Sequence, residues 1–183
     1  MKKHDNIYAK ALNKVDDFKF DESVVDVFPD MIQRSVPGYE TIVHIIGELA
    51  KSSVTPKSMV YGLGCSLGAA SLSVSRAVSA NTCEIIGVDA SSAMVERCRR
   101  VVQTFTLPNP ISIEQGLAQD VDINNASMVV MNFTLQFIPP SDREGLLASI
   151  YKGLNPGGIL VLSEKVKHPT RSGNELLIEI GRA

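Results

Sequence analysis

The chain has 183 residues, of which 44% are hydrophobic and 21% are charged. This length and composition are typical of one globular domain with an apolar core, and they exclude a disordered chain or two full-sized domains. Eighteen basic and twenty acidic side chains give a formal net charge of -2, so no overall basic surface indicates direct binding of nucleic acid.

The apolar pattern predicts helices and strands that alternate along the chain. Apolar residues at helical spacing predict helices, and short apolar runs bounded by glycine, proline or polar residues predict strands. In chain order the predicted elements are a helix over 40–51, a strand over 58–61, a helix over 66–79, a strand over 84–88, a helix over 92–105, strands over 111–114 and 128–133, a helix over 141–154 and a strand over 159–163. This alternation predicts an α/β fold, a parallel sheet with helices on both faces.

The cysteines and the N-terminus indicate the cellular compartment. Cys65, Cys83 and Cys98 are an odd number, widely spaced, and lack the CxxC spacing of a zinc site or a disulfide framework. We therefore predict no metal. The polar N-terminus lacks a secretion signal, and no apolar run approaches the length that crosses a bilayer. A cytoplasmic protein without a membrane partner is expected.

The stretch Met59–Gly68 predicts a nucleotide-cofactor site. An apolar run leads into a turn with Gly62, Gly64 and Gly68, where glycine lets the main chain approach a ligand closely. Asp89 closes the next predicted strand, at the position where a carboxylate binds a ribose diol in such sites.

The spacing of the small residues selects among cofactors. The dinucleotide pattern GxGxxG requires glycine at position 67, which is Leu67. Gly64, Ser66 and Gly68 instead match the alternating loop that holds the methionine part of S-adenosylmethionine, and the turn expected at Asn155–Gly158 before the fifth strand favours the same enzymes. The simpler alternative is that these glycines only allow tight turns.

Several longer motifs resemble the carboxy-S-adenosyl-L-methionine synthases. They are Phe20-Asp21-Glu22, 27–32 (VFPDMI), 34–39 (RSVPGY), 63–70 (LGCSLGAA), 94–100 (MVERCRR), 125–137 (NASMVVMNFTLQF) and 153–165 (GLNPGGILVLSEK). The resemblance implies a Rossmann-like class I methyltransferase fold without methyl transfer. It also implies that S-adenosylmethionine and prephenate become carboxy-S-adenosylmethionine and phenylpyruvate. The product would supply a partner enzyme that completes 5-oxyacetyl uridine at the tRNA wobble position.

The resemblance divides the single domain into three regions. Residues 1–57 would be an N-terminal lid and helix region packed on the core, 58–165 the core that binds S-adenosylmethionine, and 166–183 a divergent tail. The match fades after Lys165, and the last strands of the family, with its substrate-binding arginine, would be missing. We therefore expect Ile159–Ser163 to be an exposed apolar edge, across which the chain could form a homodimer.

The resemblance also implies which residues surround the cofactor: Tyr39, Gly64, Cys65, Ser66, Asp89, Ala90, Leu117, Ala118 and Asn132. Asp89 would accept both ribose hydroxyls, because a carboxylate offers two oxygens at the separation of a diol. The Asn132 amide would bind the amino acid portion. The alternatives are a helix cap for Asp89 and an ordinary strand-end turn for Asn132.

The remaining roles are less specific. Tyr39 would close over the cofactor as a lid or pack as an ordinary aromatic side chain. Cys65 has no histidine near it in sequence, so we expect it to offer its backbone N–H and not to act as a nucleophile. Prephenate carries two carboxylates and requires a cation, for which Arg34 is the candidate. No catalytic residue is assigned.

Two positions inside the core depart from the family. Gly62 and Leu117 stand where the family has acids, and a leucine cannot accept a hydrogen bond from the adenine amino group, so we expect weaker cofactor binding. A non-catalytic cofactor-binding or scaffold domain is therefore the second candidate function. A methyltransferase acting on a small molecule is the third.

Overall fold

The computed structural model describes residues 22–180. These residues fall into two compact units, 42–165 and the paired segments 22–41 and 166–180. The paired segments hold α1 (Glu22–Ser35) and α6 (Arg171–Ile180). Residues 1–21 of the expected lid region, with Phe20-Asp21, and the last three residues of the tail lie outside the described residues. Between residues 22 and 180, no helix combines the length and apolar character that a membrane span requires.

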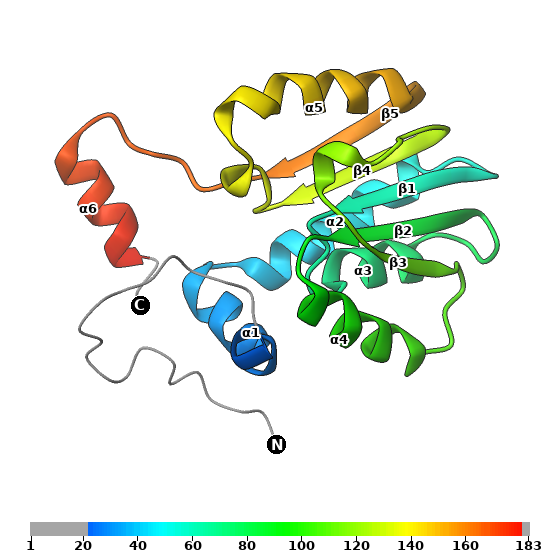
Figure 1. The fold of residues 1–183 in the computed structure, drawn as a ribbon, viewed down its shortest axis with the longest axis horizontal. Helices are drawn as coiled ribbons and strands as arrows, with labels where there is room; N and C mark the ends of the chain where they lie inside the picture. The colour runs from blue at the N-terminus through cyan, green and yellow to red at the C-terminus, as the bar shows by residue number, and fades with distance from the viewer. Residues whose placement is uncertain (1–21, 181–183) are drawn as a thin grey trace. The chain divides into compact units, whose positions relative to one another are not determined.

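A sheet of five parallel strands forms the centre of the 42–165 unit (Figure 1). Its strands are β1 (Ser58–Leu63), β2 (Cys83–Asp89), β3 (Ile111–Gln115), β4 (Ala126–Asn132) and β5 (Leu154–Ser163). Their spatial order is β3-β2-β1-β4-β5, and every neighbouring pair is parallel. Because β1 lies between β2 and β4, the direction of winding reverses beside β1. Such a reversal leaves a crevice at the carboxyl ends of the strands.

Helices cover both faces of this sheet, so the predicted α/β class is confirmed (Figure 1). On one face Val60 and Ile85 pack against side chains of α2 (Tyr39–Ser53) and α3 (Ala69–Ala77), including Ile46 and Val74. On the other face Tyr61 and Val129 pack against α5 (Pro140–Gly153), through Leu146 and Ile150. Alternate residues of β1 thus reach opposite cores, as a sheet buried on both faces requires. The remaining helix, α4 (Ser92–Gln103), packs on β3.

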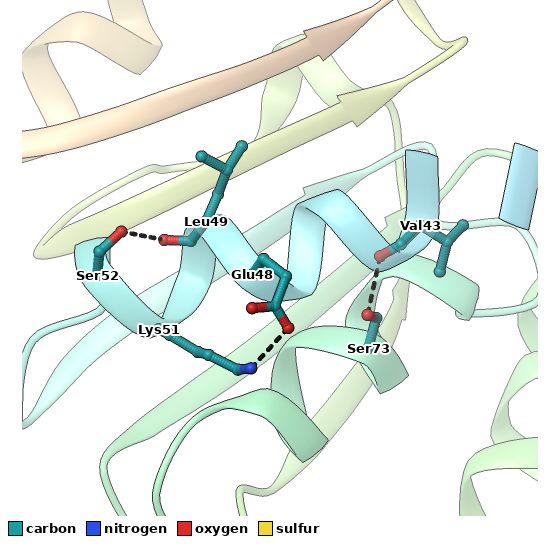
Figure 2. A network of polar contacts seen from close by, with 6 residues as sticks. All are labelled: Val43, Glu48, Leu49, Lys51, Ser52 and Ser73. Atoms are coloured by element: carbon teal, nitrogen blue, oxygen red, sulfur yellow. Dashed lines mark hydrogen bonds and ion pairs between the residues drawn. The ribbon is translucent and has the colours of Figure 1, made fainter. Parts of the chain in front are cut away.

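A close contact between α2 and α3 fixes these helices on the sheet. The hydroxyl of Ser73 on α3 donates a hydrogen bond to the carbonyl of Val43 on α2, at 2.8 Å (Figure 2). A Cβ atom on Gly47 would lie 2.5 Å from the same hydroxyl, so glycine at this position allows the close approach.

The predicted elements all occur in the structure, with boundaries that differ by a few residues, and three of these differences have a clear structural cause. The helix predicted from Ser66 begins at Ala69, because Ser66 and Gly68 have left-handed φ angles of 49° and 80°. The strand predicted to reach Phe133 ends at Asn132, since Phe133 has a φ of 60°.

The third difference concerns Asn155–Gly158, expected as a turn before the last strand. Leu154 already pairs with Ala126, and Ile159 pairs with Met128, so the segment bulges out inside β5. Gly157, with a φ of 81°, allows this bulge. Within the described residues β5 pairs only with β4, and its Leu162 is 44% exposed. The strand is therefore an edge of the sheet.

Candidate functional site

The loop after β1 lies at the carboxyl edge of the sheet and has an unusual backbone. Gly64, Ser66 and Gly68 all have left-handed φ angles, of 73°, 49° and 80°. A Cβ atom on Gly64 would collide with the side chain of Thr134, which follows β4, so this position requires glycine for both space and conformation. The loop is thereby held against the segment that leaves β4.

Asp89 joins this loop to the end of β2. Its Oδ2 accepts a hydrogen bond from the Ser66 N–H at 2.8 Å, and its Oδ1 accepts one from the Ser91 N–H at 3.0 Å. Burial raises the pKa of Asp89, and the bonds from Ser91 and Ser66 oppose that shift. Each carboxylate oxygen accepts only one of these bonds, so lone pairs remain for a ligand. The alternative that Asp89 is the helix cap was wrong, because the N-cap of α4 is Ser91, whose hydroxyl accepts a hydrogen bond from the Met94 N–H.

Asn132 ends β4 on the other side of β1. Its Oδ1 atom is buried and has no hydrogen-bond partner within residues 22–180. An acceptor left unpaired in a buried position costs free energy, so a donor from a ligand would suit this place. The next residue, Phe133, holds a left-handed conformation that aromatic side chains rarely adopt, and such strain is concentrated at functional sites.

The loop after β3 borders the site beside the end of β2. The Gly116 N–H donates to the Asp89 carbonyl at 3.0 Å, which places this loop beside the end of β2. Leu117 is 48% exposed, and Ala118 begins a short 3-10 helix, η1 (Ala118–Asp120). Ala90 is exposed directly after β2.

A cavity of about 500 Å³ begins at this loop and runs along the sheet. It is lined by Met59, Tyr61, Ile86 and Val88 of β1 and β2, and by Leu117 of the loop after β3. The remaining lining residues are mostly polar or acidic: Glu114, Gln115, Gly116, Asp120, Val121, Asp122 and Asn124. Of the residues expected around the cofactor, only Leu117 lines this cavity. The cavity is therefore largely separate from the expected cofactor site.

Seven of the expected site residues therefore lie at one edge of the sheet, where they end or follow one of the strands β1 to β4. They are Gly64, Cys65, Ser66, Asp89, Ala90, Leu117 and Asn132, and Ala118 directly follows Leu117. Arg34 and Tyr39 belong to the other compact unit. In that unit Arg34 is exposed and forms an ion pair with Asp30, with a distance of 3.5 Å, and Tyr39 begins α2.

The expected role of the Cys65 backbone was wrong. Its N–H donates to the Val88 carbonyl at 2.9 Å, together with the Gly64 N–H at 2.8 Å. The group is therefore bound within the protein, and any contact of Cys65 with a ligand would use other atoms.

Sequence reasoning also missed Thr134. Its hydroxyl donates to the Leu63 carbonyl at 2.8 Å and so connects the ends of β4 and β1. The signal available was a polar residue shortly after a largely apolar strand, at the edge where the glycine loop was already expected.

Comparisons with known proteins agree with this architecture. Residues 60–158 match a family model described as a methyltransferase domain. A solved putative S-adenosyl-L-methionine-dependent methyltransferase from Methanococcus maripaludis is similar, with a TM-score of 0.61 at 21% identity over 80% of this chain and 65% of that one. The fold is thus that of the class I S-adenosylmethionine-dependent methyltransferases.

Two curated relatives narrow this class. The carboxy-S-adenosyl-L-methionine synthase of Alteromonas mediterranea is 97% identical over 180 residues, which are 98% of this chain and 74% of the relative. An Escherichia coli enzyme of the same name is 51% identical over 98% of this chain and 73% of its own length. The chain belongs to the carboxy-S-adenosyl-L-methionine synthase family. The match includes residues 166–180, where the resemblance was expected to fade.

Proposed function

We propose that this chain converts S-adenosylmethionine and prephenate into carboxy-S-adenosylmethionine and phenylpyruvate. The observation that carries the proposal is the 97% identity to a named carboxy-S-adenosyl-L-methionine synthase. The crevice beside β1 supports it, because Asp89 and Asn132 lie at the ends of the two strands that flank β1.

The polar groups of the crevice fit the chemistry of S-adenosylmethionine. The free lone pairs of Asp89 would accept the two ribose hydroxyls. The unpaired Oδ1 of Asn132 requires a donor, which the ammonium group of the methionine portion would supply. Gly64, Cys65 and Ser66 would line the methionine portion, and the list of proposed contacts is completed by Ala90, Leu117, Ala118 and Tyr39.

The proposed reaction needs positioning more than a strong catalytic base. Prephenate breaks the bond to one carboxyl group and expels hydroxide as its ring becomes aromatic. The sulfonium methyl group loses a proton, its carbon bonds to the carbon dioxide released, and the proton and hydroxide form water. The protein has to hold both substrates together and exclude bulk water. Arg34 is proposed to bind a prephenate carboxylate.

The proposal also covers the use of the product, the cellular compartment and the oligomeric state. Carboxy-S-adenosylmethionine would serve a second enzyme that modifies the tRNA wobble uridine, so the chain itself needs no direct contact with nucleic acid. All three cysteines are free thiols, which suits the reducing cytoplasm. We propose a homodimer as the working assembly.

A non-catalytic domain that binds S-adenosylmethionine is the second candidate. Leu117 favours it, because an exposed leucine stands beside the crevice where the family has an acid. Gly62 favours it too, since this buried glycine replaces another acid and a Cβ there would lie 3.1 Å from the Ser71 hydroxyl.

Calorimetry with S-adenosylmethionine, followed by mass spectrometry of a reaction with prephenate, separates the two candidates. We expect binding and a product heavier than S-adenosylmethionine by one carbon dioxide. Binding without that product would select the non-catalytic domain. Absence of binding would contradict both.

A further inference from the structure

Two cysteine side chains meet beneath the loop that follows β1. Cys98, on α4, is fully buried, whereas Cys65, in the loop, is partly exposed. Cys65 packs against the small apolar cluster that Cys98 forms with Val95 and Ile113. Solvent therefore reaches one side of the pair, and the other side is sealed by the helix.

Two glycines leave space for both sulfur atoms. A Cβ atom on Gly87, in β2, would lie 3.1 Å from the Cys65 Sγ. A Cβ atom on Gly68 would lie 2.9 Å from the Cys98 Sγ, and the Gly68 N–H donates to the Cys65 carbonyl at 2.8 Å. The thiols thus occupy a narrow space between β2, the loop and α4.

A hydrogen bond between the thiols shifts their acidities in opposite directions. It lowers the pKa of Cys98, and the same bond, reinforced by burial, raises the pKa of Cys65. The charge of Asp89 raises the pKa of both thiols to a smaller extent. The pair therefore loses its first proton from Cys98, and Cys65 keeps its proton to a higher pH.

We propose that Cys65 and Cys98 form a reversible disulfide under a hydroperoxide, and that this disulfide weakens ligand binding in the crevice. Cys98, once deprotonated, accepts the Cys65 proton as the partly exposed Cys65 sulfur attacks the O–O bond of hydrogen peroxide. The proton leaves with the displaced hydroxide as one water, and Cys65 becomes a sulfenic acid. The Cys98 sulfur then displaces the hydroxyl group as a second water, and the S–S bond forms. The two thiols lose two electrons and two protons, and the peroxide is reduced.

The effect on binding follows from the neighbours of Cys65. A disulfide holds its sulfur atoms about 2.05 Å apart, closer than a hydrogen bond allows, so the loop and α4 must shift together. The adjacent Ser66 N–H binds Asp89 at 2.8 Å, and the Cys65 N–H binds the Val88 carbonyl at 2.9 Å. The shift would displace the carboxylate that holds the ribose. This second step rests on the proposed function, whereas disulfide formation does not.

Peptide mapping tests the first step. The reduced protein is treated with hydrogen peroxide, alkylated, digested and analysed by mass spectrometry. We expect a peptide that joins Cys65 to Cys98 with the loss of two hydrogens, reversed by dithiothreitol, while Cys83 remains alkylated. Cys83 is a matched control because it is also a buried thiol, at the amino end of β2. Oxygen added to Cys65 without a cross-link would overturn the proposal.

Calorimetry with S-adenosylmethionine tests the second step. We expect the affinity of the wild-type protein to fall about tenfold on oxidation. Oxidation should leave the affinity of Cys98→Ala unchanged, and Cys83→Ala should respond as the wild type does. Equal affinities for the reduced and cross-linked wild-type protein would overturn the regulatory step. If the reduced protein binds no S-adenosylmethionine, the proposed function fails. Peptide mapping then still tests whether Cys65 and Cys98 form a disulfide. If Cys98→Ala does not fold, peptide mapping of the wild-type protein decides whether the disulfide forms.

Discussion

Asp89 keeps a carboxylate in a half-buried position, and its pKa is raised by that burial. The folded protein therefore holds this proton at a pH where the unfolded chain, with a pKa of about 3.9, has released it. Stability from Asp89 is present at low pH and is lost as the pH rises through the raised folded value.

Asp89→Asn removes this titration. We expect the free energy of unfolding of the wild type, minus that of the variant, to fall as the pH rises from about 3.5 to 7. Urea unfolding at a series of pH values measures the difference. A difference that grows with pH would show that hydrogen bonds outweigh burial at Asp89.

Leu117 allows a gain of binding to be tested at one residue. Leu117→Asp places an acceptor where the adenine amino group is proposed to lie. Relief of an unpaired donor is worth roughly 1–3 kcal/mol, so the affinity for S-adenosylmethionine should rise about tenfold. Leu147→Asp, at another exposed leucine on α5, is the control and should have no effect in the same calorimetry. Equal affinities of Leu117→Asp and the wild type would argue against the proposed adenine position.

At the scale of elements, the contact between Gly64 and Thr134 connects the loops that follow β1 and β4. Gly64→Ala adds a Cβ that collides with Thr134 and has to adopt a left-handed φ. Gly157→Ala is the control, because its φ is also left-handed and nothing lies within 4 Å of the added atom. We expect Gly157→Ala to cost about 1–2 kcal/mol in unfolding experiments and Gly64→Ala to cost more.

The double variant Gly64→Ala, Thr134→Ala should recover part of this extra cost, because the second change removes the colliding side chain. Denaturant unfolding of both single variants and the double variant gives the coupling. Purely additive effects would mean that backbone conformation alone explains the cost at Gly64.

These elements also show what a sequence can and cannot predict. The apolar runs of β1, β2 and β4 and the glycines after β1 report local conformation, so the sheet and its carboxyl edge could be predicted. The bond between the Ser66 N–H and Asp89 joins residues 23 positions apart. Such pairings depend on how the loops meet in space. The hydrogen bond from the Cys65 N–H to the Val88 carbonyl depends on the same arrangement. The left-handed φ of Phe133 has no local signal either, because its residue type disfavours it.

At the scale of the whole molecule, the proposed homodimer is a prediction about the open edge of β5. Leu162→Lys adds a charge to an exposed position of this strand, and charged side chains on an edge disfavour pairing with a second sheet. We expect the wild type to elute as a dimer and Leu162→Lys to shift toward monomer, measured by size exclusion with light scattering. Tyr151→Lys, at an exposed position of α5, is the control and should remain dimeric. A monomeric wild type would contradict the prediction.

The bulge of residues 155–158 limits how another chain could add to this sheet. A strand joining the open side needs a continuous row of amide and carbonyl groups at regular spacing. In β5 that regularity holds only from Ile159 to Ser163, because the preceding residues depart from the register of β4. Any intermolecular ladder would therefore be short and anchored near the carboxyl end of the sheet, because the irregular first half of β5 offers no such row to a second chain.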